Sequence, residues 1–444
     1  MKAALATRYA NLEWAVFDRE ANLDDYFGLA ARRIASARDE GAAKAAFDGL
    51  IRRLGDGHVE IDWPSVSASQ DSKTHDTCAE AGYDARKSGS PLAALAKGYA
   101  PLTTLSPPVF PAGIISIDHR KLGVLRIGMF GPQGTPHLCT DALAALSIAP
   151  DAPCDDACSD RIDNWAHARM TRAFIEEVKA LKAAKIDALL VDVTGNGGGS
   201  EWAEAAARML TGVKLKSERM DFVRGSQWTK EFADAEAKLR TWAKTASAKD
   251  RALLLRLAAA AEAKHRVAAT ACDSAAIWRR QQPTCSWLGE GFFASGMLAS
   301  GDPAELAGKP WAATVFTPME YPYADGVWRG PLVVLVDGET WSAAEEFAAV
   351  LQDNHAAVIM GAPTGGAGCG HTDGSQPVVL VNSAGKLQLP DCARIRADGT
   401  NEVRGVRPDV LIGWRRFDGP HLRASETLAA LPQAIGAAER QANQ

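Results

Sequence analysis

The sequence predicts an α/β fold built on a parallel or mixed sheet, and two observations lead to that prediction. Short apolar runs rich in β-branched residues lie at 188–193 and 332–336, and each is followed by a turn and then by apolar residues at helical spacing. A strand at 123–130 and a helix at about 163–184 precede the first run, which completes a strand–helix–strand unit. Strands connected in this way favour parallel pairing.

The other predicted elements follow from the same two periodicities. In chain order they are two helices within 22–54 divided at Gly41, a strand at 59–63, a short helix near 91–98, a cysteine-bearing loop insertion at 131–160, a helix at 202–210, a strand at 356–361, a hairpin at 377–381 with 386–389, and a helix at 424–440.

Composition divides the chain into five regions. They are an N-terminal helical bundle at 1–62, an irregular Ser-, Pro-, Thr- and Gly-rich linker at 63–120, an α/β core at 121–214 and 301–420, a helical insertion at 215–300, and a C-terminal helix at 421–444. Ala, Leu, Lys, Arg and Glu dominate 228–272, which predicts a helical hairpin closed by Cys272 and Cys285. A solvated decoration is favoured for this insertion over a lid or an interaction arm.

Overall composition is that of a soluble globular protein. The 444 residues are 47% hydrophobic and 23% charged, with a net charge of -5. That charge is too small to indicate binding to nucleic acid or to a membrane surface. No apolar run reaches the roughly 18 residues that a membrane span needs.

The eight cysteines favour disulfides in an exported protein over reduced thiols. Their number is even, they lie mostly in loop-like stretches, and Cys154 and Cys158 have no second pair at a metal-binding interval. The N-terminus lacks the apolar core of a signal peptide, so we expect a signal to have been removed from it. The pairing of the cysteines stays open.

Ser342 is the most informative candidate residue. It lies between the strand at 332–336 and the helix that begins at Ala343, where backbone N–H groups are unpaired and the helix dipole is positive. A nucleophile that forms an oxyanion would be placed there. The alternative is structural, because Ser342 with Glu345 also forms a capping box, and most such matches are only caps.

Three other segments contain residue types that acyl transfer uses. The Gly-rich turn at 192–200 follows a buried strand and allows close backbone approach, while the lysine of a phosphate-binding loop is missing. His58 lies on a loop with two glycines and is either a general base or a solvated side chain. Glu402 precedes a turn and is either an orienting carboxylate or a surface acid.

Taken together, these segments resemble the tail-specific, or C-terminal-processing, serine peptidases and their tricorn-like relatives. The matching stretches are Asp192 to Gly199, Trp341 to Glu345, Leu351 to Asp353, Gly361 to Gly366 and Glu402 to Asp409. The resemblance covers about 120–200 and 325–415, plus the Gly-Asp-Gly-His motif that ends at His58. It implies a ClpP/crotonase-like core, and the shortness of 64–120 predicts that no PDZ domain is present.

Departures from the family pattern change the expected mechanism. Ala367 stands where the Ser/Lys branch has its lysine base, so the resemblance favours the tricorn-like branch, in which His58 would be the base. Trp341 replaces a small residue before the serine and is expected to narrow the site. Thr194 replaces an arginine, so we expect one supporting ion pair to be lost.

The resemblance implies a role for each candidate residue. Ser342 would be the nucleophile, His58 the base, and Glu402 the residue that orients His58 through an intermediary. The remaining candidates are the oxyanion donors Gly198 (or Gly197) and Ala343, the capping residue Glu345, and the structural residue Asp353. No metal or organic cofactor is expected, and the expected partner is a peptide or protein substrate, captured through a strand added to a sheet edge.

Two other classes of function stay open. A degenerate relative would bind peptides or apolar ligands without cleaving them, although Ser342, His58 and Glu402 are all present. An acyl-CoA enzyme of crotonase type would need a basic patch near the glycines, and none is visible around 192–205.

Overall fold

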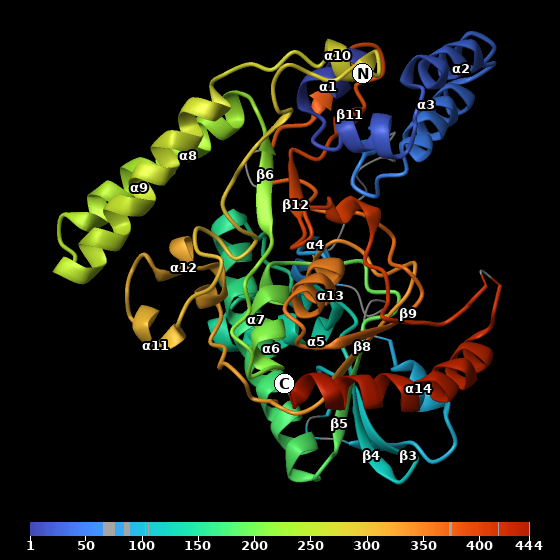
Figure 1. Ribbon diagram of the computed structural model, residues 1–444, viewed down its shortest axis with the longest axis vertical. Coiled ribbons are helices and arrows are strands. Elements are labelled where there is room, and N and C mark those ends of the chain that lie inside the picture. The colour runs from blue at the N-terminus through green and yellow to red at the C-terminus, as the bar shows by residue number, and fades with distance from the viewer. Residues whose placement is uncertain are drawn as a thin grey trace. The chain divides into compact units, whose positions relative to one another are not determined.

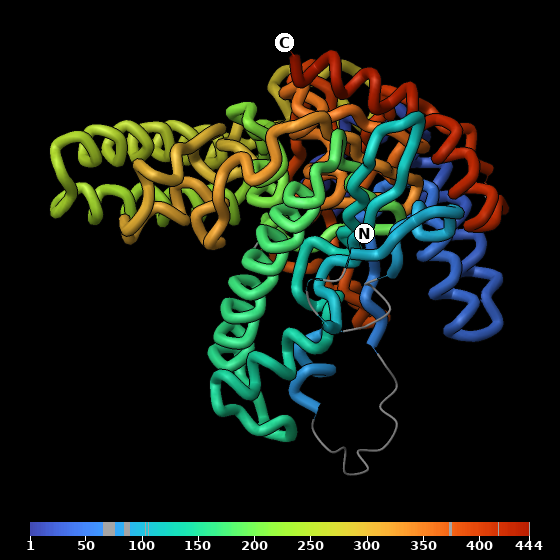
Figure 2. Tube along the Cα trace, turned by 90° about the horizontal axis from the view of Figure 1, so that it is seen from below, coloured from blue at the N-terminus to red at the C-terminus, as the bar shows by residue number. Residues whose placement is uncertain are grey.

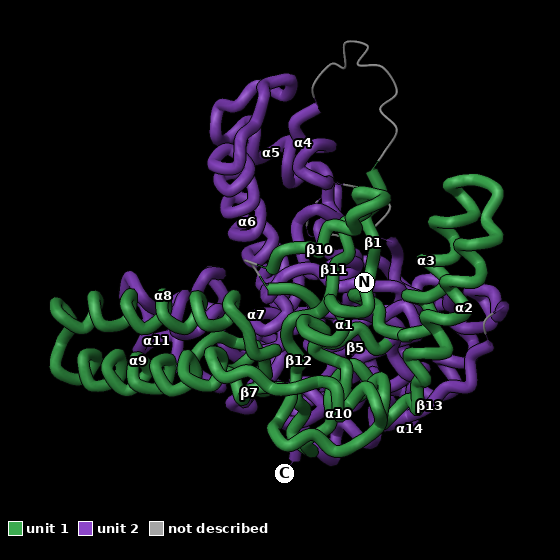
Figure 3. The backbone as a smooth tube through the Cα atoms, turned by 90° about the horizontal axis from the view of Figure 1, so that it is seen from above, with its two compact units in different colours: residues 1–67, 218–297, 366–404 green, residues 68–217, 298–365, 405–444 purple. Residues whose placement is uncertain are grey.

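The fold is described from a computed structural model of the chain (Figures 1 and 2). The structure describes residues 1–64, 76–83, 89–102, 104, 106–372, 375–415 and 417–443. The chain forms two compact units, and each is assembled from three stretches (Figure 3). Unit 1 contains residues 1–67, 218–297 and 366–404, and unit 2 contains residues 68–217, 298–365 and 405–444.

Unit 2 is built on a seven-stranded sheet with the strand order β13-β9-β8-β5-β4-β3-β2. The five strands from β13 to β4 are parallel, and β3 and β2 complete the sheet antiparallel. The strands are β2 (Ala100–Leu102), β3 (Ala112–Ile117), β4 (Arg120–Arg126), β5 (Ala188–Asp192), β8 (Leu332–Val336), β9 (Val358–Gly361) and β13 (Val410–Leu411). The predicted α/β class with a mostly parallel sheet is confirmed.

Helices cover both faces of this sheet. Successive side chains of a strand point to opposite faces, and every residue of β5 and β8 is buried. Val191 packs with Phe347 on one face, and Leu190 packs with Leu431 on the other. The helices of unit 2 are α4 (Thr77–Glu80), η3 (Leu92–Leu95), η4 (Pro132–Gly134), α5 (Pro136–Leu146), α6 (Asp156–Ala183), α7 (Trp202–Met209), α11 (Pro303–Leu306), α12 (Ala312–Val315), η5 (Thr317–Glu320), α13 (Ala343–Asp353) and α14 (Pro420–Ala442).

Unit 1 contains two three-stranded sheets, with the strand orders β1-β11-β10 and β12-β6-β7. The strands are β1 (Glu60–Asp62), β6 (Arg219–Val223), β7 (Leu288–Gly289), β10 (Val378–Val379), β11 (Lys386–Gln388) and β12 (Cys392–Ile395). The helices are α1 (Lys2–Arg8), the π-helix η1 (Trp14–Asp18), α2 (Leu23–Ala35), α3 (Glu40–Leu54), α8 (Ser226–Ala243), α9 (Ala248–Ala268), α10 (Ala275–Trp278) and η6 (Glu402–Arg404). Helices α8 and α9 lie side by side as the predicted hairpin (Figure 2).

Several predicted elements need correction. The stretch at 131–160 is not a loop, because it contains helix α5 and the start of α6, where the Asp155 side chain accepts a hydrogen bond from the Cys158 N–H at 2.9 Å. Helices α2 and α3 separate before Asp39, which caps α3, and Gly41 lies inside that helix. Strands β2 and β3 were not predicted, and residues 65–75 and 84–88 of the predicted linker lie outside the described residues.

All eight cysteines are paired within one unit or the other. The disulfides join Cys78 to Cys139, Cys154 to Cys158, Cys272 to Cys285 and Cys369 to Cys392. The predicted preference for disulfides over free thiols is therefore confirmed. Among the described residues, no helix combines the length and the apolar character needed to cross a membrane.

Candidate active site

Ser342 occupies a strained turn between β8 and α13 in unit 2. Its backbone has φ 56° and ψ −122°, a conformation that L-residues rarely adopt and that costs about 1–3 kcal/mol. A sharp strand-to-helix turn of this kind is how α/β hydrolases project a nucleophilic serine. The strain indicates a functional constraint on Ser342, which a helix cap alone would not require.

Glu345 stabilises the first turn of α13 from below Ser342. Its Oε2 accepts a hydrogen bond from the Ser342 N–H at 3.0 Å, and its Oε1 accepts one from the Thr364 hydroxyl at 2.6 Å. The capping interaction that the sequence predicts is thus present, and it coexists with the strained backbone. Asp353 is the last residue of α13.

Gly198 brings the Gly-rich turn against the serine. It has φ 106°, and a Cβ built on it would lie 2.7 Å from the Ser342 Cβ and 3.1 Å from the Ala343 nitrogen. Only glycine therefore fits at this position. The predicted proximity of the turn, the serine and the start of α13 holds within unit 2.

The backbone N–H groups around Ser342 differ in how they are bonded. The Gly198 N–H donates to the Asn196 Oδ1 at 2.9 Å, so this predicted oxyanion donor already has an acceptor. The N–H groups of Ala343 and Gly197 have no acceptor among the described residues. Next to Ser342, the Ala343 N–H is therefore available to a ligand, whereas the Gly198 N–H would have to be shared with Asn196.

Three further hydrogen bonds tie the Gly-rich turn to the segment before Ser342. The Trp341 N–H donates to the Asn196 carbonyl at 2.9 Å, and the Thr340 hydroxyl donates to the Val193 carbonyl at 3.0 Å. The Gly195 N–H donates to the Asp337 Oδ1 at 2.8 Å. These bonds hold the turn and the serine segment in one geometry.

Arg126 corrects the expectation that an ion pair is lost at this turn. Its guanidinium, at the end of β4, lies 3.0 Å from the Asp192 carboxylate, and both side chains are buried. The Thr194 hydroxyl donates to the same carboxylate oxygen at 2.7 Å. Arg126 of β4 therefore supplies the positive charge beside Asp192 that Thr194 cannot supply.

His58 lies in unit 1, on the loop between α3 and β1. Gly55 ends α3 in the left-handed conformation with φ 70°, and the Arg19 guanidinium fills the space that a Cβ would need. The Asp56 carboxylate is buried and accepts hydrogen bonds from the His58 N–H at 3.0 Å, the Tyr9 hydroxyl at 3.0 Å and the Asn11 amide at 2.8 Å. The conformation of the loop is therefore set from inside unit 1.

The imidazole of His58 is oriented by a backbone carbonyl. Its Nδ1 lies 2.7 Å from the carbonyl oxygen of Ala367, and because a carbonyl only accepts, Nδ1 carries the proton and the lone pair is on Nε2. Burial lowers the pKa of His58 below its usual value of 6.5. A half-buried, neutral imidazole with a basic Nε2 is the state that a general base requires.

Glu402 lies in η6 of unit 1, buried against Arg394. The Arg394 guanidinium binds the Glu402 carboxylate and also donates to the Gly368 carbonyl at 2.9 Å. Gly368 follows Ala367, whose carbonyl holds His58. A route from Glu402 to His58 through Arg394 and the backbone at 367–368 therefore exists within unit 1.

The sequence did not single out Asp56, Arg126 or Arg394. Asp56 has a signal in the Gly-Asp-Gly-His motif itself, since a polar residue between two glycines often bonds the backbone two residues on. Arg126 and Arg394 have none, because each lies on a strand and only the fold identifies its partner: Asp192 on the neighbouring strand β5 for Arg126, and Glu402 in η6 for Arg394.

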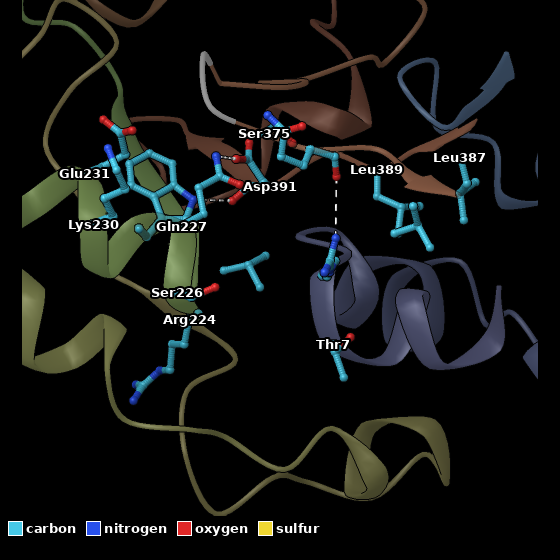
Figure 4. A pocket seen from close by; sticks show the side chains of 16 residues that line it. Thr7, Arg224, Ser226, Gln227, Lys230, Glu231, Ser375, Leu387, Leu389 and Asp391 are labelled. Carbon is cyan, nitrogen blue, oxygen red and sulfur yellow. Dashed lines mark hydrogen bonds between the residues drawn. The ribbon is translucent and has the colours of Figure 1, made fainter. Parts of the chain in front are cut away.

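A pocket of about 660 Å³ lies elsewhere in unit 1 (Figure 4). It is lined by α1, the end of β6, the first turn of α8, and β10 and β11, and neither His58 nor Glu402 lines it. One lining residue, Asp391, donates its N–H to the carbonyl of Gly370, and a Cβ on Gly370 would lie 2.9 Å from the His58 Nε2. The pocket wall is thus bonded to the segment that packs on His58.

A parallel sheet with a strained serine at the start of a helix and an uncapped N–H beside it defines a serine hydrolase of the α/β class. The family model of peptidase family S41 matches residues 161–412, which is more than half of the chain. The chain belongs to peptidase family S41 and is a serine-type peptidase, as the motifs of the tail-specific peptidases predict.

Two solved structures of CPAF share the fold at low sequence identity, and a third structure is similar to a smaller extent. Mature CPAF matches with a TM-score of 0.58 and 16% identity over 99% of this chain and 96% of that one. CPAF complexed with lactacystin matches with a TM-score of 0.56 and 15% identity over 99% and 97% of the two chains. A putative peptidase from Parabacteroides merdae has a TM-score of 0.48 and 11% identity over 98% and 93%. No curated protein matches the sequence.

Proposed function

We propose that this S41 peptidase cleaves peptide bonds through an acyl-enzyme on Ser342, with His58 as the general base. The observation that carries the proposal is the strained backbone of Ser342 beside the Ala343 N–H. The tautomer of His58 supports it, because the lone pair is on Nε2, the atom that can accept a proton.

In the first step, the Ser342 hydroxyl proton passes to His58 Nε2 while Oγ attacks the peptide carbonyl carbon. The carbonyl oxygen becomes an oxyanion, and we assign one of its donors to the Ala343 N–H. The second donor is Gly197 or Gly198, and Gly198 would share its N–H with Asn196. One such donor is worth about 3 kcal/mol in other enzymes.

In the second step, His58 returns the proton to the departing amine, and the peptide bond breaks. A water molecule then attacks the acyl-enzyme with His58 again as base, which releases the carboxylic acid and restores the Ser342 hydroxyl. We assign Glu402 the task of holding His58 through Arg394 and the loop at 366–370.

The mechanism is tested with a fluorophosphonate probe and a peptide library on the wild type, Ser342→Ala and His58→Ala. We expect labelling of the wild type alone on Ser342, and a loss of cleavage by at least about 10³-fold in both variants. Cleavage at the wild-type rate by either folded variant would exclude the proposed pair. A folded wild type that neither reacts nor cleaves would favour the degenerate binding relative.

We further propose that the substrates are peptides or protein tails with a free C-terminus, in an oxidising compartment outside the cytoplasm. The four disulfides support the compartment, since such bonds persist where thiols are not kept reduced. Matched peptides with a free or an amidated C-terminus test the specificity. Equal kcat/KM for the two would exclude tail recognition but leave the acyl-enzyme mechanism intact.

A further inference from the structure

A second buried glutamate lies beside Glu402, and the mechanism above does not use it. Glu218 directly precedes β6 in unit 1 and is 4% exposed, while Glu402 is 1% exposed. Neither carboxylate oxygen of Glu218 accepts a hydrogen bond among the described residues. A buried carboxylate that accepts no hydrogen bond is uncommon and requires an explanation.

The register between β6 and β12 places Glu218 among arginines. Because Ile395 pairs with Arg219, the next position along puts Glu218 opposite Arg396, and side chains two residues apart share a face. The Arg396 Nε lies 3.2 Å from one Glu218 oxygen, and the Arg394 Nε lies 3.9 Å from the other. Arg394 instead donates hydrogen bonds to Glu402 and to the Gly368 carbonyl.

Burial and the charge of Glu402 favour the neutral form of Glu218, and they outweigh two arginines that favour the charged form. The groups that face it are Arg394 from β12, Arg396 directly after β12, and Glu402 from η6. Burial raises the pKa of Glu218 well above its usual value, and the negative charge of Glu402 raises it further. A protonated carboxyl group donates a hydrogen bond. A protonated Glu218 would therefore need no donor on either of its oxygens, which is what the structure shows.

We propose that Glu218 is a positioning residue that, when protonated, donates a hydrogen bond to Glu402 and so holds Arg394 on the Gly368 carbonyl. That carbonyl is adjacent to the Ala367 carbonyl, which fixes the Nδ1 proton of His58. Loss of the donor lets Glu402 and Arg394 rearrange and frees the loop that orients the imidazole. The inference rests on His58 being the base.

The test compares Glu218→Gln with Glu218→Ala. The glutamine is neutral and keeps a donor toward Glu402, so we expect a kcat within about twofold of the wild type, whereas the alanine lowers kcat by about tenfold or more at unchanged KM. At alkaline pH the wild type should lose kcat as Glu218 deprotonates, and Glu218→Gln should lack that decline. An equal loss in both variants, or no loss in either, would overturn the proposal.

The thermal midpoint gives a readout that does not depend on catalysis. The folded pKa of Glu218 is raised, so the wild type binds more protons when folded than when unfolded, and its stability should fall as pH rises from the ordinary glutamate pKa toward the raised one. The midpoint of Glu218→Gln should not fall over that window. A parallel fall in both proteins would contradict a protonated Glu218.

Two further variants distinguish a failure of the Glu218 proposal from a failure of the proposed function: a matched control at Glu204 and the substitution of His58. Glu204 in unit 2 is also fully buried and bound by an arginine, Arg208, so Glu204→Gln should lower the thermal midpoint without the alkaline change in kcat. Wild-type activity in His58→Ala would overturn the proposed function, while the dependence of the thermal midpoint on pH would still report on Glu218.

Discussion

Ser342 has a backbone conformation that is strained for a residue with a Cβ and that glycine adopts without strain. We predict that Ser342→Gly raises the free energy of unfolding by about 1 kcal/mol, because glycine adopts φ 56° without penalty. Ser342→Ala should show no such gain, since alanine keeps the Cβ. Both variants should be inactive, so stability and activity separate at this position.

Urea unfolding of the two Ser342 variants and the wild type measures the effect. The glycine and alanine variants share the loss of the hydroxyl, so their difference reports the backbone strain alone. Equal free energies of unfolding for the two would show that position 342 is relaxed.

His58 predicts where activity fails on the acid side. Burial lowers its pKa below 6.5, and only the neutral imidazole accepts the serine proton, so the acid limb of kcat/KM should lie below pH 6.5. The same shift predicts that stability falls as pH drops from 6.5 toward the lowered pKa, because the unfolded chain then binds more protons.

The pH profile of kcat/KM with an unchanging peptide substrate checks this limb. A positive charge on His371, whose ring centre is 5.9 Å from that of His58, contributes to the lowered pKa. In His371→Asn the limb should therefore move to higher pH without disappearing. An acid limb at or above pH 6.5 in the wild type would argue against His58 as the base.

At the scale of elements, the loop at 366–372 carries most of the support for His58. It provides the Ala367 carbonyl, the Gly368 carbonyl for Arg394, and Gly370 against the imidazole. The Cys369–Cys392 disulfide ties this loop to β12. The loop therefore has a covalent anchor between the two carbonyl contacts and the packing contact.

We predict that removing this disulfide by replacing both cysteines with serine lowers both stability and kcat. A bridge spanning 23 residues is worth about 3 kcal/mol by loop-closure entropy, and its loss also loosens the carbonyls that hold His58 and Arg394. Chemical denaturation and steady-state kinetics measure the two effects.

The Cys154–Cys158 bridge in unit 2 provides the comparison, because it spans only four residues. Its double serine variant should lose about 2 kcal/mol or less and keep its kcat. If both double variants lose kcat equally, the effect comes from general destabilisation and not from the loop at 366–372.

The central strands of unit 2 are predictable from local sequence, whereas strands β6 and β12 of unit 1 are not. Strands β5 and β8 are fully buried and read as continuous apolar runs, so their pattern is local. Strands β6 and β12 are short, and their pairing joins residues far apart in the chain, which no window of sequence shows. The helices at 131–160 were missed because a proline and an aspartate that begin helices also occur in loops.

The candidate site divides in the same way. Ser342, His58 and Glu402 are predictable because each lies in a short motif whose residues are neighbours in sequence. Arg394 and Glu218 are not, because their roles arise from the pairing of β6 with β12 and from a carbonyl on another loop. Charge type alone would place both on the surface.

At the scale of the whole molecule, the chain passes between the two units five times, so each unit consists of three separate stretches. A single cut in any connecting segment therefore cannot release either unit as a free fragment. A peptidase that nicks itself at one such place would keep all its pieces associated through packing. A denaturing gel would therefore separate the fragments of such a nicked chain, while the mass of the native protein would be unchanged.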